Sequence, residues 1–421
     1  MLSRADLELT RRDTGISGLG TLLDVAAIEG RIRRLAPDFP LEAPLSAASY
    51  IRYVPGRRCV AAYASARSRG FPAVYASAGP AAADGEPAPP DRAAPGTDLL
   101  NLDDLCVEIR AFPNDRRLRT LRRMADPAAR GRLLSAVGLD RQALGCFEPE
   151  LLRYRPERRC VLRLGPASGP AVVMKLHWKH AFEAAQHNSE RFQPGKVLQV
   201  PRRLGTSDRH RAMAFAWIPG CTVRSMLRGA RPDFEAIGRA GVALAELQSQ
   251  DPGGNAPELD PLADLDRTRA FLSAVAPEHD GRTTDLVSRI AEALGAIEPV
   301  HRSVHGDFHD DQVIVAGDRI AILDLDEACL GNPLVDPGRF LAHLERDRIL
   351  GQIPPGVARR ARRAFLDGYQ RILLPTDALS IFVALGLVRL LPSVFRKSRD
   401  HWPDLIASLL DAVEDTLRLP G

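Results

Sequence analysis

The chain has 421 residues, of which 45% are hydrophobic and 26% are charged, and this composition excludes a disordered or fibrous protein. The 57 Lys and Arg residues nearly balance the 53 Asp and Glu residues, so we expect neither a nucleic-acid nor a membrane partner. The N-terminal residues contain no apolar stretch of the kind that directs secretion, and we expect a cytoplasmic protein. The six cysteines form no Cys-x-x-Cys pair, which argues against a zinc site or a disulfide framework.

A short repeat marks the first half of the chain. Residues 50–60 read YIRYVPGRRCV and residues 151–161 read LLRYRPERRCV, with seven identical positions in eleven. Each copy leads into a second short apolar run, PAVYASA at 72–78 and PAVVMKL at 170–176, a pattern typical of strand–turn–strand units. We interpret the repeat as a duplication; the alternative is two unrelated strands with chance similarity.

Three domains are predicted. The first, residues 1–146, contains a Pro- and Ala-rich stretch at 79–98 that we expect to be a mobile loop. Its segment 105–124 reads as a strand followed by a basic stretch, which we interpret as a solvated helix face, with a binding patch as the alternative. Residues 147–220 are strand-like and end at a Pro-Gly break, and residues 221–421 are mostly helical.

The helical region contains one predicted hairpin, residues 313–323, which turns at Gly317-Asp318. Farther on, Asp336-Pro337 predicts the start of a helix, with Asp336 as the N-cap. Antiparallel pairing within the hairpin would bring residue 324 beside residues 311–312. Carboxylates that converge in this way repel one another unless a cation lies among them, and Mg²⁺ prefers oxygen ligands. We therefore expect a cation near five acids, with a solvated acidic loop as the alternative: Asp307, Asp310, Asp311, Asp324 and Asp326.

The same segment resembles the catalytic and metal-binding loops of the aminoglycoside phosphotransferase and choline kinase family, small-molecule relatives of the protein kinases. The resemblance rests on His-Gly-Asp at 305–307 and on Asp-Leu-Asp at 324–326, and it covers about residues 147–400. It implies an α+β, two-lobed protein-kinase-like fold with a β-rich small lobe and a helical large lobe. It also implies ATP- and Mg²⁺-dependent transfer of the γ-phosphate to a hydroxyl of a small molecule. The N-terminal domain has no His-Gly-Asp of its own, so we interpret it as a degenerate small lobe, or as a cap of similar topology, that does not bind nucleotide.

The resemblance assigns expected roles to the residues of the catalytic segment. Asp307 would be the catalytic carboxylate, and Asp324 and Gln312 would be metal ligands. Gln312 departs from the Asn that is usual in the family, as it does in maltokinase-like members. His305 would hold the loop in place, and Asp326 would assist the site or be a surface acid.

The resemblance also implies a nucleotide site. Lys175 would hold the α- and β-phosphates and pair with Glu190 on the next helix, with Glu183 as the alternative partner. In the first repeat the matching position falls near Ser77, so that copy lacks the lysine. The backbone around Ala216 and Ile218 would meet the adenine edge.

The sequence is compatible with more than one class of acceptor. An amino sugar or aminoglycoside would be drawn to acidic residues such as Glu246, Asp264 and Asp367, whereas a maltokinase-like enzyme would take a neutral sugar. A catalytically silent pseudokinase that senses nucleotide or binds a partner is the alternative function. A protein kinase is a third possibility, but no Ala-Pro-Glu segment follows the Asp-Leu-Asp at 324–326, where a protein kinase would have it.

Overall fold

The computed structural model describes residues 2–65, 71–80, 98–251, 256–370, 378–396 and 401–418. Most of the predicted mobile loop 79–98 lies outside these residues. The chain divides into two compact units, and the first consists of Met1–Phe182, Leu204–Phe215 and Ser393–Trp402. The second unit consists of Glu183–Arg203, Ala216–Pro392 and Pro403–Gly421. Within the described ranges, no helix has the length and apolar character needed to cross a bilayer.

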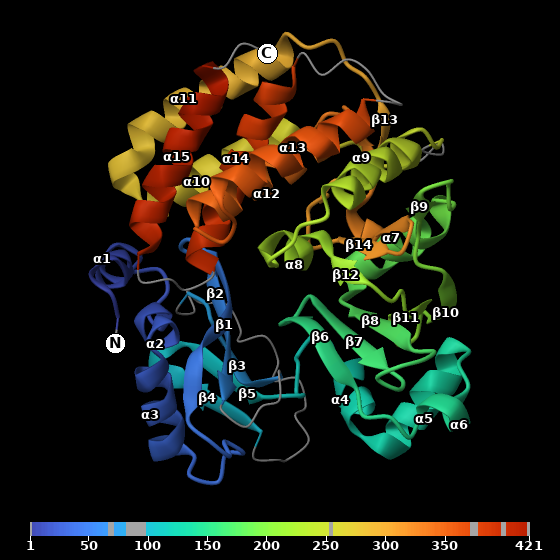
Figure 1. Cartoon of the computed structure of the whole chain (residues 1–421). Coiled ribbons are helices and arrows are strands. Elements are labelled where there is room, and N and C mark those ends of the chain that lie inside the picture. The colour runs from blue at the N-terminus through green and yellow to red at the C-terminus, as the bar shows by residue number, and fades with distance from the viewer. Residues whose placement is uncertain are drawn as a thin grey trace. The chain divides into compact units, whose positions relative to one another are not determined.

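The first unit opens with three helices and a five-stranded sheet in the order β1-β2-β3-β5-β4 (Figure 1). The helices are α1 (Arg4–Arg12), α2 (Leu19–Leu23) and α3 (Val25–Leu35). The strands are β1 (Leu45–Val54), β2 (Arg58–Ser65), β3 (Pro72–Ala78), β4 (Leu99–Leu102) and β5 (Val107–Ala111), with a 3-10 turn, η1 (Asp103–Leu105), before the last.

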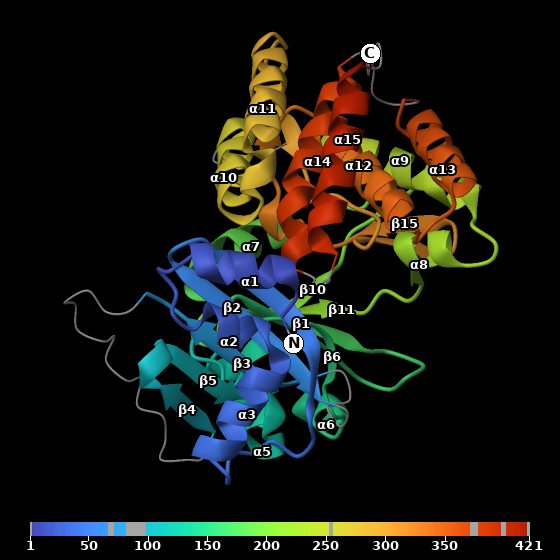
Figure 2. The same cartoon turned by 90° about the vertical axis from the view of Figure 1, so that its left-hand side faces the viewer.

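A second set of helices and a second five-stranded sheet follow (Figure 2). The helices are α4 (Thr120–Ala125), α5 (Pro127–Val137) and α6 (Arg141–Leu144). The strands are β6 (Glu150–Arg155), β7 (Arg159–Leu164), β8 (Val172–His177), β10 (Arg203–Ser207) and β11 (Ala212–Ala216). Their order, β6-β7-β8-β11-β10, is the order of the first sheet with each strand replaced by its counterpart. Apolar side chains of α4, α5 and this sheet form one buried cluster, which includes Leu121, Leu133, Leu162 and Met174.

Strand pairing aligns the two copies of the repeat residue by residue. Ser77 pairs with Val60 between β2 and β3, and Lys175 pairs with Val161 between β7 and β8. Because the two valines are equivalent positions of the repeat, Ser77 occupies the place of Lys175. The first sheet therefore has the strand order of the second without its lysine.

The tight turn of each copy has a residue in the left-handed region, Gly56 with φ 65° and Glu157 with φ 62°. Glycine adopts this conformation without steric strain, whereas a glutamate needs compensating contacts. The fully buried carboxylate of Glu157 lies 2.7 Å from the guanidinium of Arg58 and 3.5 Å from that of Arg52. These two arginines come from the first copy, so the turn residue of the second copy binds the first.

An aspartate outside the repeated motif fixes each turn. Asp13 accepts hydrogen bonds from the Tyr53 hydroxyl at 2.6 Å and from the turn amide at 2.9 Å. Asp115 accepts the same two bonds from the Tyr154 hydroxyl at 2.7 Å and from its turn amide at 2.8 Å. The likeness of the copies thus extends beyond the strands, and it supports the interpretation of a duplication.

The second unit is mainly helical and contains two small sheets (Figure 1). Its four-stranded sheet has the order β12-β14-β15-β9, from β9 (Leu198–Gln199), β12 (Cys221–Thr222), β14 (Val313–Ala316) and β15 (Arg319–Ile322). The other sheet pairs β13 (Arg302–Val304) with β16 (Cys329–Gly331).

The helices of the second unit are α7 (Lys179–Arg191), α8 (Val223–Arg228), α9 (Phe234–Gln248), α10 (Pro261–Val275), α11 (Asp280–Gly295), α12 (Val335–Ile349), α13 (Pro355–Tyr369), α14 (Leu379–Arg396) and α15 (Trp402–Arg418), with 3-10 turns η2 (Pro277–His279) and η3 (Leu325–Glu327). Parts of α7, α14 and α15 belong to the first unit.

The predicted hairpin is confirmed as β14 and β15. Val313 pairs with Ile322 and Ala316 pairs with Arg319, and the turn residue Gly317 has φ 63°. Past the end of the paired strands, the amide of Leu323 donates to the carbonyl of Gln312 at 2.8 Å. Residue 324 therefore starts beside residue 312, as the pairing argument predicts.

Candidate active site

His305 connects the loop that follows β13 to the end of β15. Its Nε2 lies 2.8 Å from the carbonyl oxygen of Leu323, and its Nδ1 accepts a hydrogen bond from the amide of Asp307 at 3.2 Å. These two contacts place the ring proton on Nε2, because Nδ1 acts as the acceptor. The fully buried ring thus fixes the Asp307 backbone relative to the residue before Asp324.

Asp336 also holds the loop that contains His305 and Asp307 in place. Its buried carboxylate accepts hydrogen bonds from the amides of His305 at 2.8 Å and Gly306 at 3.0 Å, and from Nε2 of Gln248 at 2.9 Å. Burial raises the pKa of Asp336 above its ordinary value, although these donors oppose the rise. The prediction that Asp336 caps the helix is wrong, because α12 begins one residue earlier with Leu334 at the cap. Its side chain is used for the loop instead.

Arg224, just after the start of α8, neutralises two of the five acids. Its guanidinium forms a two-pronged contact with Asp310, at 2.8 and 3.1 Å, and lies 3.0 Å from Asp311. For Asp310 and Asp311, the expected positive charge is therefore supplied by the side chain of Arg224. This part of the metal expectation is corrected by the structure.

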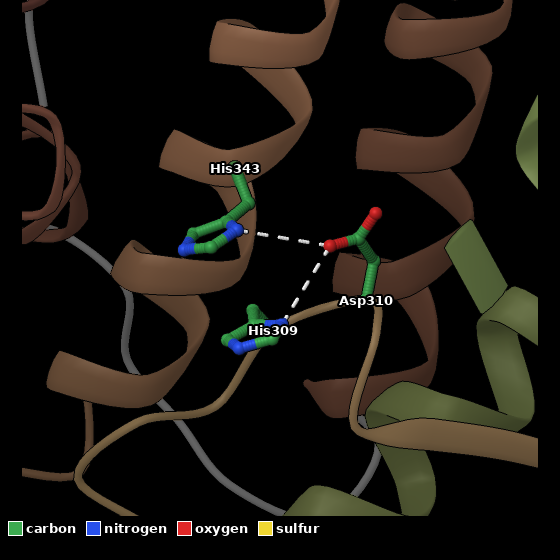
Figure 3. A group of neighbouring side chains, drawn as sticks. All are labelled: His309, Asp310 and His343. Carbon is green, nitrogen blue, oxygen red and sulfur yellow. Dashed lines mark ion pairs between the residues drawn. The ribbon is translucent and has the colours of Figure 1, made fainter. Parts of the chain in front are cut away.

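His309, Asp310 and His343 form a compact buried group whose potential ligand atoms lie within 4.8 Å of one another (Figure 3). The two imidazole rings are stacked, with centroids 4.5 Å apart and an angle of 5° between their planes. An imidazole nitrogen binds a metal in the plane of its ring, so two rings stacked face to face are poorly aimed at one ion. The carboxylate of Asp310 is also engaged by Arg224. The geometry therefore does not fit a metal centre.

Gln312 joins the two carboxylates that the sequence singles out. Its Nε2 donates to Oδ2 of Asp307 at 3.2 Å and to Oδ2 of Asp324 at 3.4 Å. Asp324 itself has φ 63°, a left-handed conformation that is uncommon outside glycine and that occurs often at functional sites. Asp307, Gln312 and Asp324, which are predicted to lie in one site, are therefore close together.

The donor set of these three residues fits Mg²⁺. It offers carboxylate and carboxamide oxygens, which are the ligands that this ion prefers. Oε1 of Gln312 is buried and accepts no hydrogen bond within the described part of the chain. The amide nitrogen of Gln312 faces both carboxylates, and a cation would be expected at that position. Flipping the amide group would place the unpartnered Oε1 there instead of the nitrogen.

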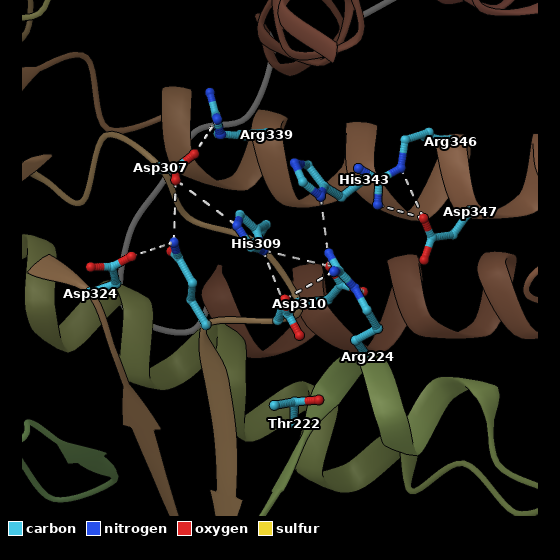
Figure 4. A network of polar contacts seen from close by, with 12 residues as sticks. Thr222, Arg224, Asp307, His309, Asp310, Asp324, Arg339, His343, Arg346 and Asp347 are labelled. Atoms are coloured by element: carbon cyan, nitrogen blue, oxygen red, sulfur yellow. Dashed lines mark hydrogen bonds and ion pairs between the residues drawn. The ribbon is translucent and has the colours of Figure 1, made fainter. Parts of the chain in front are cut away.

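Arg339, on α12, forms an ion pair with Asp307 (Figure 4). Burial alone would raise the pKa of Asp307, but the charge of Arg339 outweighs it. The result is a pKa of about 2, so this carboxylate stays ionised through the neutral range. Sequence analysis did not identify Arg339.

The predicted phosphate-binding lysine lies in the first unit. Lys175 is in the middle of β8, and its ammonium nitrogen lies 5.4 Å from the centroid of the Phe215 ring. Both candidate partners, Glu183 and Glu190, are in the part of α7 that belongs to the second unit. There, Glu190 forms an ion pair with Arg203. The pairing of Lys175 with a glutamate stays a prediction.

The predicted adenine-binding segment follows β11 in the second unit. The amide of Ala216 donates to the carbonyl of Arg202 at 2.9 Å, and the side chain of Ile218 is buried against Ile314 and Ala321 of the hairpin sheet. The packing of Ile218 fixes this segment to the hairpin that leads to Asp324.

Asp326 lies in the turn η3 directly after Asp324, with a half-buried side chain. Its carbonyl, and that of Ala328, accept hydrogen bonds from Nδ2 of Asn188 at 3.2 and 2.9 Å. The buried Asn188 thus holds the backbone of this turn, and sequence analysis did not identify it.

Two of the acidic residues that were expected to attract an aminoglycoside have close partners within the second unit. Glu246 accepts from backbone amides that include Leu198 at 2.8 Å, and Asp264 lies 3.0 Å from Nε of Arg389. Asp367 is exposed on α13. Two of the three carboxylates are therefore already neutralised or bonded within the second unit.

The sequence of the chain identifies its family. The model of the phosphotransferase enzyme family matches residues 149–374, more than half of the chain. The chain belongs to the phosphotransferase enzyme family. Its protein-kinase-like fold, a five-stranded sheet followed by a helical region with an embedded hairpin, is the one expected from the resemblance. No curated protein matches the sequence.

Solved structures similar to this phosphotransferase-family chain share little sequence with it. A choline/ethanolamine kinase family protein from Mesorhizobium loti is 17% identical, with 65% of this chain and 90% of that chain covered and a TM-score of 0.47. The aminoglycoside phosphotransferase APH(4)-Ia, in a ternary complex with AMP-PNP and hygromycin B, is 14% identical, with 64% and 93% covered and a TM-score of 0.46. The spectinomycin phosphotransferase APH(9)-Ia, in complex with ADP and spectinomycin, is 12% identical, with 68% and 97% covered and a TM-score of 0.45.

Proposed function

We propose that the protein is an ATP- and Mg²⁺-dependent kinase that transfers the γ-phosphate to a hydroxyl group of a small molecule. The observation that carries the proposal is the contact of one amide group, that of Gln312, with both Asp307 and Asp324. Membership of the phosphotransferase enzyme family supports the reaction class.

In this proposal, Asp324 and Gln312 would hold Mg²⁺, which would neutralise charge on the nucleotide phosphates. Asp307 accepts a hydrogen bond from the acceptor hydroxyl and orients its oxygen toward the phosphorus. Because the low pKa of Asp307 makes it a weak base, it positions the hydroxyl and takes up the proton only late in the transfer. Phosphoryl transfer tolerates this well, since positioning and charge neutralisation supply most of the catalysis.

The remaining predicted roles concern the nucleotide. Lys175 would hold the α- and β-phosphates, with Glu190 or Glu183 as its partner. The backbone at Ala216 and Ile218 would meet the adenine edge. His305 and Asp336 act by holding the catalytic loop, as the hydrogen bonds that they accept from its backbone support.

For the acceptor, the contacts favour a neutral sugar over an aminoglycoside. A polycationic acceptor needs unpaired carboxylates near the reacting hydroxyl, whereas Asp264 is paired with Arg389 and Asp307 with Arg339. The guanidinium group of Arg339 beside Asp307, and that of Arg389 at the carbonyl of the preceding residue, would repel the amino groups of an aminoglycoside.

A silent pseudokinase is the second candidate, and the Arg339–Asp307 ion pair is the observation that favours it. An arginine that stayed on the catalytic carboxylate would block the acceptor hydroxyl. Under this alternative, the protein binds nucleotide and transfers nothing.

The test combines a thermal-shift titration with an ATP-consumption screen over neutral sugars, amino sugars and aminoglycosides. The proposal predicts a Mg²⁺-dependent rise in Tm with ATP, and ATP consumption with at least one hydroxylated acceptor. Binding without consumption on any acceptor would favour the pseudokinase, and the absence of nucleotide binding would contradict both.

A further inference from the structure

A basic pocket in the first unit has no role in the proposed reaction. Its volume is about 610 Å³, within the usual range for small-molecule sites. The residues that line it belong to the first unit, whereas Asp307, Gln312 and Asp324 belong to the second. Its lining includes six arginines: Arg110, Arg116, Arg117, Arg119, Arg209 and Arg211.

The charge of the lining is strongly positive. Glu108 is its one carboxylate, and the Arg110 guanidinium already binds it through two hydrogen bonds, at 2.8 and 3.1 Å. Among the described residues, Arg209 and Arg211 have no carboxylate partner. Burial, together with Arg123 and Arg209, lowers the pKa of His210 in the same wall, as a positive potential would.

Two further arginines share a single counter-ion. Arg116 and Arg117 lie 3.6 and 3.8 Å from the buried carboxylate of Glu157, which also binds Arg52 and Arg58. One negative charge thus serves four guanidinium groups. The four arginines Arg116, Arg117, Arg209 and Arg211 therefore face one described carboxylate, that of Glu157, and their positive charge exceeds it.

The walls are held in place before any ligand binds. The Thr120 hydroxyl donates to the His210 carbonyl at 2.9 Å, and the His177 amide donates to the Arg211 carbonyl at 3.0 Å. The guanidinium carbon of Arg117 lies 4.4 Å from the centroid of the Trp178 ring. A site whose walls are fixed in advance loses less entropy on binding.

We propose that this pocket binds a phosphorylated small molecule. Guanidinium groups bind phosphate oxygens through paired hydrogen bonds, and several of them in one cavity favour a multiply charged phosphate over a neutral ligand. The pocket joins the N-terminal region, through residues 108–120, to the end of β8, the strand that carries Lys175. A ligand bound here links the two sheets next to the lysine.

The test measures binding of inorganic pyrophosphate by isothermal titration calorimetry, in EDTA, to the full-length protein and to a double variant. The double variant combines Arg209→Ala with Arg211→Asn; asparagine is chosen because residue 211 has φ 48°, which asparagine tolerates. Loss of two charge-assisted contacts is expected to weaken binding at least about tenfold. The matched control, Arg34→Ala with Arg57→Ala, removes two exposed arginines of the same unit that do not line the pocket, and is expected to bind like the wild type.

Lys175→Ala separates this pocket from the proposed nucleotide site, and it is expected to keep the binding in EDTA. Three results would overturn the proposal: no saturable binding to the wild type, equal loss in the control variant, or loss in Lys175→Ala with retention in the double variant. Citrate is the comparison anion, and binding as tight as that of pyrophosphate would overturn the assignment to phosphate. None of these readouts depends on ATP turnover, so the proposed kinase function can fail while this proposal stands.

Discussion

The guanidinium of Arg339 forms an ion pair with the carboxylate of Asp307. The pair lowers the pKa of Asp307 to about 2 even though burial alone would raise it. A carboxylate with a lowered pKa is ionised at every pH above that value and loses its charge only when the pH falls through it.

Replacement of Arg339 by alanine is therefore expected to move the acid limb of the activity profile upward. In the wild type, protonation of Asp307 occurs near pH 2, so it contributes no acid limb in the range of ordinary assays. Without the arginine, burial raises the pKa toward or above the ordinary carboxylate value of about 4. The measurement is kcat/KM against pH, with Arg359→Ala, an exposed arginine of α13, as the control. Identical acid limbs in the three proteins would contradict this role.

Asp336→Ala is expected to reduce both stability and turnover. The substitution removes the acceptor for two backbone amides and for Gln248, and leaves these donors buried. Such a loss costs about 2–4 kcal/mol in the free energy of unfolding. Urea denaturation measures this cost, and Asp367→Ala, at an exposed acid of α13, is expected to stay within about 0.5 kcal/mol of the wild type. Equal effects of the two substitutions would show that Asp336 does not support the loop.

Gln312→Ala is expected to raise the Mg²⁺ concentration needed for half-maximal Mg·ATP binding by at least about tenfold, since loss even of a residue that only supports a metal ligand typically costs that much. The reason is that Oε1 of Gln312 is a buried acceptor without a partner among the described residues. Fluorescence titration of Mg²⁺ at fixed ATP is a suitable assay. Asp318→Ala, at the exposed hairpin turn, is the control. If both variants behaved like the wild type, Gln312 would not be a metal ligand.

The two copies of the repeat are expected to respond alike to loss of the same hydrogen bond. Tyr53→Phe removes the bond to Asp13, and Tyr154→Phe removes the bond to Asp115. Each substitution is expected to cost about 1 kcal/mol or somewhat more in the free energy of unfolding, because each leaves a carboxylate without one donor. Chemical denaturation of the two single variants is the test, and a cost in only one copy would argue against equivalent turns.

The sequence predicts the local features of the site well. The hairpin of β14 and β15 depends on a glycine turn between two short apolar runs, and its pairing then requires that Asp324 lie near Gln312. Likewise, the repeated motif predicts two strand–turn–strand units, and identical positions pair identically in the two sheets.

The residues that contact the catalytic loop and its carboxylates could not be predicted in the same way. Arg224 and Arg339 are two arginines among many, and only the tertiary structure brings them to Asp310 and Asp307. Asp336 precedes a proline, which favours a helix start and conceals its use as an acceptor for the loop.

The basic stretch in 105–124 shows the same limit. We interpreted it as a solvated helix face, yet its arginines at 116, 117 and 119 line a pocket together with residues 209–211. Helical periodicity indicates which side of a helix is polar, but it does not indicate which distant segment of the chain lies next to that side. The alternative interpretation, a binding patch, is the one that the pocket supports.

The most direct test of the central claim compares Asp307→Ala with the wild type in two assays, acceptor-dependent ATP turnover and equilibrium binding of Mg·ATP. The account predicts that the variant loses turnover almost completely while its affinity for Mg·ATP stays close to that of the wild type. Near-normal turnover by Asp307→Ala would contradict the assignment of this carboxylate, and with it the proposed mechanism.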